Sequence, residues 1–105
     1  MKQLSRITPA TADVLEYLLG ASAPVWGLLI IKETGRPAGS IYPILERLEN
    51  AGWAVSQWDA ETDRGPRRRL YSLTAEGAAA APAALARNQA RQEIKGVRPV
   101  TRFAS

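Results

Sequence analysis

The sequence predicts a mainly α-helical domain with one small β-hairpin, an α+β fold, on three observations. Apolar residues recur at helical spacing in segments joined by a tight turn, Thr34-Gly35-Arg36-Pro37. Residues 53–58 and 68–73 alternate as strands do, and turn-forming residues lie between them. An alanine-rich segment then begins after Thr74. This order of elements is typical of a winged helix-turn-helix with a C-terminal dimerisation helix.

The first two helices are predicted over residues 9–20 and 25–33. Thr8 can cap the first helix, Pro9 suits its first position and Gly20 ends it. The second segment is short and rich in β-branched residues near its end, so periodicity alone also permits a buried strand. Gly35, directly after it, favours the helix because glycine commonly ends helices.

The third segment, about residues 40–51, is predicted to be an amphipathic helix. Ile41, Leu45 and Leu48 form one apolar stripe with Ile44 at its edge. Pro43 would remove a hydrogen bond deep inside a helix, which favours Ser40 as the N-cap. This helix would enter a DNA major groove, and the hairpin behind it, with its tip at about residues 59–68, would be the wing.

The C-terminal helix is predicted to start after Thr74 and to be kinked or interrupted by Pro82. The domain organisation expected is an arm over 1–8, a winged-helix domain over 9–77, a dimerisation helix over 78–95 and a flexible tail over 96–105. Arg87, Arg91 and Lys95 form a basic stripe on this last helix.

Composition limits the classes of function. The 105-residue chain has the size of one domain, a net charge of +4, and neither cysteine nor histidine. Without thiols and imidazoles, an enzyme is not expected, nor is a metal or a cofactor. No apolar run is long enough for a membrane span or a signal peptide, so the predicted location is the cytoplasm.

Three stretches resemble the PadR family of bacterial transcriptional regulators. They read W-G-L-L-I-I-K from residue 26, G-S-I-Y-P-I-L-E-R-L-E-N-A-G-W from residue 39 and G-P-R-R-R-L-Y-S-L-T-A-E-G from residue 65. The resemblance covers about residues 9–80. It implies a winged-helix domain that binds double-stranded DNA, a homodimer, and repression of an adjacent gene or of the regulator's own gene. Members of this family can respond to small molecules, but the sequence identifies no effector and no pocket, and control by a partner protein or by expression level is the alternative.

The candidate DNA contacts lie on the turn, the third helix and the hairpin tip. They are Lys32, Arg36, Ser40, Tyr42, Pro43, Arg47, Arg64, Arg67 and Arg68. Four arginines between residues 64 and 69 can reach phosphates or a narrow minor groove. The alternatives are a solvated loop partly neutralised by nearby acids, a half-buried supporting role for Tyr42, and an ion pair with Glu46 for Arg47. Arg69, at the start of the return strand, is expected to form a structural salt bridge.

The three tryptophans are interpreted mainly as packing residues. Trp26 is expected between the first two helices and Trp53 at the base of the hairpin, with Trp58 exposed. The function predicted is a dimeric, sequence-specific DNA-binding repressor reading a pseudo-palindromic operator. The alternative is a winged-helix interaction module that docks on an acidic protein.

Overall fold

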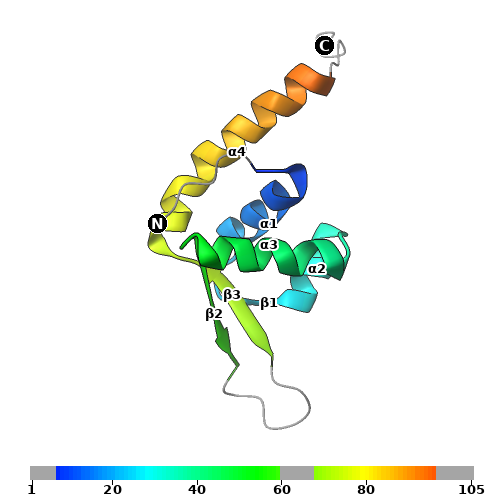
Figure 1. The fold of residues 1–105 in the computed structure, drawn as a ribbon. Helices are drawn as coiled ribbons and strands as arrows, with labels where there is room; N and C mark the ends of the chain where they lie inside the picture. Colours follow the sequence, from blue (N-terminus) through cyan, green and yellow to red (C-terminus); the bar gives the residue numbers. More distant parts are fainter. Residues whose placement is uncertain (1–6, 60–67, 97–105) are drawn as a thin grey trace.

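The computed structural model describes residues 7–59 and 68–96. In these ranges the elements follow the order α1 (Pro9–Gly20), β1 (Val25–Trp26), α2 (Gly27–Thr34), α3 (Ala38–Asn50), β2 (Ala54–Trp58), β3 (Arg69–Leu73) and α4 (Ala75–Gly96) (Figure 1). The predicted arm up to residue 6, most of the wing tip and the tail from residue 97 lie outside the described residues. The winged helix-turn-helix fold with a C-terminal helix is confirmed.

Helix α1 has the predicted bounds. The side-chain oxygen of Thr8 accepts a hydrogen bond from the backbone N–H of Thr11 at 3.1 Å, and Pro9 is the first helical residue. The cap satisfies one of the N–H groups that a helix start leaves without an internal partner. Local sequence therefore determines where this helix begins.

The second predicted helix was wrong at its start, because Val25 and Trp26 form a short strand before α2 begins at Gly27. Val25 pairs with Tyr71 and Trp26 with Leu70, antiparallel. Strand β3 also pairs with β2, so the sheet has the order β1-β3-β2 with β3 in the centre. The pairing partner lies more than forty residues away, and local periodicity carries no information about it.

Helix α3 begins before Ser40, which was wrongly predicted as its N-cap. Pro37 occupies the cap position, and its carbonyl accepts hydrogen bonds from the N–H groups of Ser40 and Ile41 at 2.9 and 3.0 Å. Pro43 therefore lies inside the helix, where it cannot donate to the carbonyl of Gly39. Gly39 is exposed, so water can satisfy that carbonyl.

The hairpin has the predicted strands, each one residue shorter at its start. Ala54 pairs with Leu73, Ser56 with Tyr71 and Trp58 with Arg69. The N–H of Asp59 donates to the carbonyl of Arg68 at 2.7 Å, directly beyond this ladder. The base of the wing is therefore a regular antiparallel pair.

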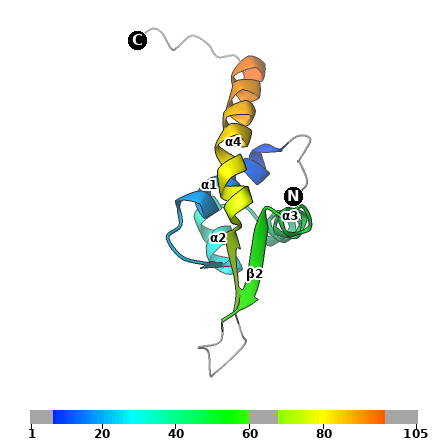
Figure 2. The ribbon, with the colours of Figure 1, turned by 90° about the vertical axis from the view of Figure 1, so that its left-hand side faces the viewer.

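Helix α4 continues through Pro82, contrary to the predicted interruption. Thr74 caps it as expected, with its side-chain oxygen accepting from the N–H of Gly77 at 2.9 Å. Alanine has the highest helix propensity, and Ala81 and Ala84 are buried on the side that packs against α1. Both views show α4 running beside α1 and then extending beyond the rest of the domain (Figures 1 and 2).

The core lies between α1, α2, α3 and the sheet. Its largest fully buried apolar side chains are Leu15, Ile30, Ile41, Leu45 and Leu48. Trp53 is 3% exposed and joins this cluster, as expected for a residue that anchors the hairpin. Within the described ranges, no helix combines the length and the apolar character that a membrane span needs.

Candidate nucleic-acid interface

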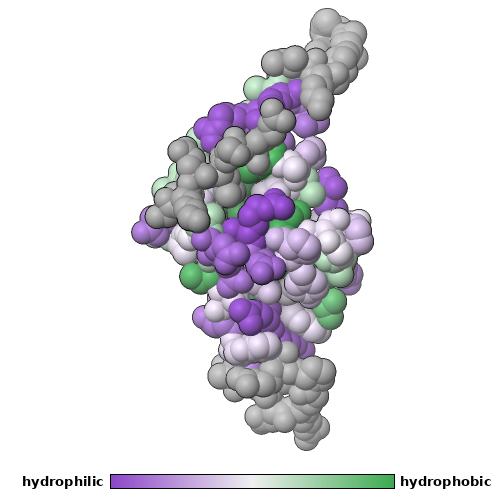
Figure 3. Space-filling view, in the orientation of Figure 1, coloured by the Kyte–Doolittle hydropathy of each residue, from purple (hydrophilic) through white to green (hydrophobic). Residues whose placement is uncertain are grey.

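Helix α3 has one buried face and one polar, exposed face. Ile41, Ile44, Leu45 and Leu48 are buried, at spacings of three and four residues. The exposed residues are Tyr42, Pro43, Glu46, Arg47 and Asn50. In the view that has α3 in front, the middle of the molecule is largely hydrophilic (Figure 3). A helix exposed in this way has the width and the donors to lie in a DNA major groove.

The residues of α3 that are predicted to contact DNA differ in their exposure to solvent. Pro43 and Arg47 are exposed, and Arg47 forms no salt bridge with any residue that the structure describes. Ser40 is half-buried. Tyr42 is 39% exposed, and its ring lies so close to Gly27 that an added Cβ there would be 2.9 Å from Cε1 and from the hydroxyl. Tyr42 thus supports the contact between α2 and α3 while part of its ring stays accessible.

Arg36 is held by an acidic residue of α1. Its Nε donates to Oδ2 of Asp13 at 2.8 Å, and the two side chains are 36% and 43% exposed. Gly35, with φ of 73°, ends α2 as predicted, and the left-handed conformation suits glycine. The salt bridge therefore fixes the turn between α2 and α3 against α1. A phosphate contact by Arg36 stays a prediction, and it requires the guanidinium to reach past or leave Asp13.

We expect Asp13→Ala and Arg36→Ala each to lower the free energy of unfolding by about 0.5 kcal/mol, because a half-exposed ion pair is screened by water. Urea denaturation of the two single variants and the double variant measures the coupling between them. The coupling should shrink when salt is raised to about 1 M. Purely additive losses in the double variant would show that the pair contributes nothing.

Lys32 and Arg68 come together beside β1. Both are exposed, and both line a groove of about 440 Å³ between α2 and the start of β3. The guanidinium carbon of Arg68 lies 4.7 Å from the centre of the Trp26 ring, the geometry of a cation–π contact. Trp26 was wrongly predicted to pack between α1 and α2, because it belongs to the edge strand β1. Two cations predicted to contact DNA therefore share one surface.

A hydrogen-bonded network joins α3 to both strands of the wing. The hydroxyl of Ser56 donates to Oε2 of Glu49 at 2.5 Å, and Nε of Arg69 donates to the Ser56 oxygen at 3.0 Å. Nη2 of Arg69 lies 3.9 Å from the same Glu49 oxygen, which confirms the structural salt bridge predicted for Arg69. Burial raises the pKa of Tyr71, which pairs with Ser56 across the sheet, further above physiological pH.

The network of Glu49, Ser56 and Arg69 links helix α3 to the two strands of the wing. Glu49 belongs to α3, whereas Ser56 and Arg69 belong to β2 and β3. The orientation of the wing base is therefore tied to helix α3. From the sequence, Glu49 was expected only to repel phosphate and so to help set orientation, and its structural partners were not predicted. The available signal was a carboxylate at the end of an amphipathic helix that leads into a basic hairpin.

The base of the wing also carries Trp58, which is 49% exposed as expected. The guanidinium of Arg69 lies 5.2 Å from the centre of its ring. The predicted contacts Arg64 and Arg67 lie outside the described residues.

On α4, Arg91 of the predicted basic stripe donates from Nη2 to the backbone carbonyl of Ile7 at 2.7 Å. Arg91 therefore ties α4 to the segment that precedes α1. The stripe is not a uniform solvated surface, since one of its members has a structural partner.

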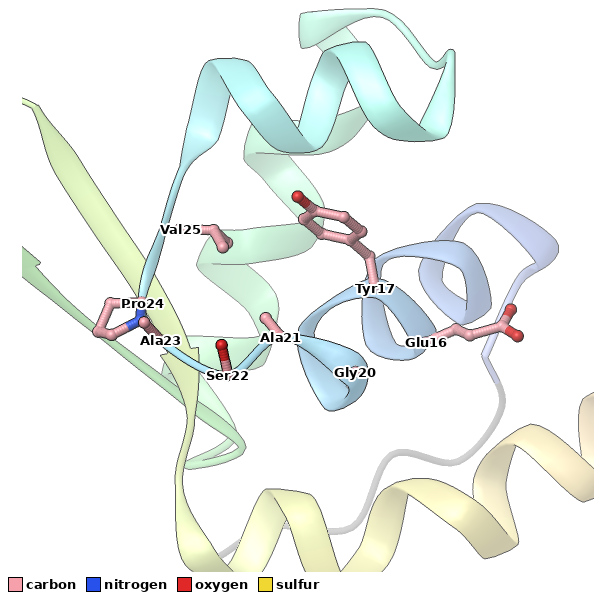
Figure 4. A pocket seen from close by; sticks show the side chains of 8 residues that line it. All are labelled: Glu16, Tyr17, Gly20, Ala21, Ser22, Ala23, Pro24 and Val25. Atoms are coloured by element: carbon pink, nitrogen blue, oxygen red, sulfur yellow. The ribbon is translucent and has the colours of Figure 1, made fainter.

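A second hollow, of about 620 Å³, lies between the end of α1 and the connector to β1. Figure 4 shows Tyr17 and Val25 pointing toward one another across it, while Glu16 points away. Small side chains, including Ala21 and Ala23, form much of the remaining wall. This lining gives little basis for choosing one class of ligand.

Comparisons with known proteins agree with this geometry. The model of the transcriptional regulator PadR-like family matches residues 14–83. The chain is 26% identical to a PadR-like transcription factor from Bacteroides fragilis, with a TM-score of 0.62 over 81% of this chain and 84% of that one. A probable transcriptional regulator from Pseudomonas aeruginosa is 29% identical, with a TM-score of 0.67 over 88% and 68% of the two chains. No curated protein matches the sequence.

A likeness of fold alone extends to the PcaV transcriptional regulator from Streptomyces coelicolor. It is 22% identical, with a TM-score of 0.70 over 95% of this chain and 69% of that one.

Proposed function

Because the chain belongs to the PadR-like family of transcriptional regulators, we propose that it is a dimeric repressor of a pseudo-palindromic DNA operator. In this proposal α3 reads base edges in the major groove, and the wing holds the phosphate backbone or enters the minor groove. In this proposal the protein acts in the cytoplasm, where its DNA is, and has no enzymatic role, as is usual for transcriptional regulators of this family.

The observation that carries the proposal is the exposed face of α3. Arg47 has the length and the donors to bind a guanine edge, and its guanidinium has no acidic partner among the described residues. Lys32 on α2 and Arg68 at the base of the wing add positive charge on one surface. The network through Glu49 and Ser56 supports simultaneous docking of α3 and the wing, because it limits their relative movement.

The dimer is supported by the surface of α4. Its side away from α1 carries exposed alanines at spacings of four, three and four residues: Ala79, Ala83, Ala86 and Ala90. Small side chains let two helices approach closely, and α4 extends beyond the domain, where a second copy can reach it (Figure 2). We therefore propose that the two copies meet along α4.

The proposal is tested by selecting bound duplexes from genomic DNA and footprinting the tightest one. We expect two half-sites about one helical turn, about 10 base pairs, apart. Arg47→Ala should cost about 1–3 kcal/mol on that site and relax the preference at one base pair in each half-site. Binding of no duplex at low salt, together with capture of one acidic protein, would support the interaction module instead.

A further inference from the structure

The groove beside β1 combines two cations with an apolar wall. It is lined in part by Trp26, Leu28, Leu29, Lys32, Arg68 and Leu70. We propose that this groove binds a small amphipathic anion with an aliphatic body, of the class of medium-chain carboxylates, and that the bound anion weakens the grip on DNA. The effect on DNA rests on the proposed function, whereas the binding itself does not.

Charge selects an anion. Among the residues that the structure describes, none that lines the groove is acidic, and neither Lys32 nor Arg68 forms a salt bridge. The guanidinium of Arg68 lies over the face of the Trp26 ring, 4.7 Å from its centre. Stacking of this kind holds the planar group in place and leaves its edge N–H donors available to an anion. Lys32 supplies a second positive charge on the facing helix.

The apolar wall selects an aliphatic body. Leu28 is 49% exposed and Leu29 is 38% exposed, although both carry large apolar side chains. Leu70, Pro24 and Val25 complete the apolar part of the lining. The aromatic face that could stack on a flat ligand is that of Trp26, and Arg68 already lies over it. A flexible alkyl chain covers leucine side chains with less need for such a face.

The volume of the groove also suits a small-molecule ligand. Its volume of about 440 Å³ is within the range of small-molecule sites, roughly 300–1,000 Å³. A carboxylate between Lys32 and Arg68 would place an alkyl chain along the leucines of α2. The ligand gains charge pairing at one end and buries apolar surface at the other.

The position of the groove gives the anion a regulatory effect. Arg68 lies at the base of the wing, next to the start of β3. An anion that pairs with Arg68 and Lys32 removes positive charge from the surface that would hold DNA phosphates. The two ligands then compete for the same cations, so each lowers the affinity of the other.

Binding is tested by titrating the full chain with octanoate in a calorimeter. Acetate provides the charge alone, octylammonium provides the chain with the opposite charge, and 2-naphthoate provides a flat aromatic body. We expect saturable binding of octanoate and weaker or undetectable binding of the other three. Equal binding of octylammonium would exclude charge selection, and tighter binding of 2-naphthoate would exclude the aliphatic preference.

Variants locate the site. Lys32→Gln and Leu28→Asn should each weaken octanoate binding about tenfold, since one removes a charge and the other removes apolar contact. Both side chains are exposed, so the fold should survive, and far-ultraviolet circular dichroism checks this. Arg87→Gln removes an exposed charge from α4 and should leave octanoate binding unchanged. Unaltered binding in both groove variants would overturn the assignment.

The proposed effect of the anion on DNA binding is tested by a separate measurement of duplex affinity. Octanoate should weaken duplex binding by the natural chain, whereas Leu28→Asn, which alters no predicted DNA contact, should bind duplex normally and resist octanoate. If octanoate binds but DNA affinity does not change, the competition is wrong. If no duplex binds even without octanoate, the proposed function fails while the calorimetric result still decides the anion site.

Discussion

Replacing Gly77 by alanine is expected to destabilise the domain by about 3 kcal/mol or more. A Cβ at this position would lie 2.1 Å from the carbonyl oxygen of Trp53 and 2.8 Å from its carbonyl carbon. These are backbone atoms, so the clash cannot be relieved by turning a side chain. The first turn of α4 would have to move away from the start of the hairpin.

The same contact region holds several hydrogen bonds. The carbonyl of Trp53 accepts from the N–H of Thr74 at 2.9 Å, and the carbonyl of Gly52 accepts from the Thr74 hydroxyl at 2.8 Å. Displacing α4 would weaken these bonds together with the burial of Ala81 against α1. Because a domain of this size is stable by only about 5–15 kcal/mol, the loss should be obvious.

The measurement is urea denaturation followed by tryptophan fluorescence, with Gly39→Ala as the matched control. Gly39 lies inside α3 and has no positive φ, and a methyl group added there would meet no atom of another element within 4 Å. Alanine there should stabilise the domain by about 0.5–1 kcal/mol through its higher helix propensity. If Gly77→Ala and Gly39→Ala unfolded at the same urea concentration, the close approach of Gly77 to the Trp53 carbonyl would be contradicted.

The elements that the sequence predicted well are those with local signals. Thr8 and Thr74 cap their helices through N–H groups three residues away, and the stripe on α3 follows from helical spacing. By contrast, β1 depends on pairing with β3, and α4 passes Pro82 while its alanines pack on α1. Both outcomes depend on contacts between remote segments, and at Pro82 these contacts overrode a local preference against helix.

In the candidate site, too, the sequence predicted what depends on local signals and missed contacts between remote segments. The structural salt bridge of Arg69 followed from its place at the start of a strand. The partner of Arg36 could not be foreseen, because Asp13 lies 23 residues away on another helix. The same is true of the stacking of Arg68 on Trp26, since it requires β1 to be a strand. The sequence therefore identified the charged residues of the candidate site, but not the residues that they contact.

The second large effect is expected at the wing. Arg67→Ala with Arg68→Ala should weaken operator binding by about 2–3 kcal/mol, or roughly 30- to 150-fold, at low salt. Each arginine that pairs with a phosphate releases a counterion on binding. The slope of log K against log salt should therefore become shallower by about 2. A minor-groove role would give a similar loss of affinity, but with the largest change on sites whose flanks are rich in A·T pairs.

The structure provides a control for net charge. Arg87 is exposed on α4, the helix that runs away from the wing in Figure 1. Arg87→Ala removes the same charge as Arg68→Ala, so a purely global effect would make the two single variants bind alike. A local effect confines the change in affinity and slope to Arg68→Ala. If the double wing variant kept the natural affinity and slope, the wing would have no part in holding DNA, and α3 alone would have to account for binding.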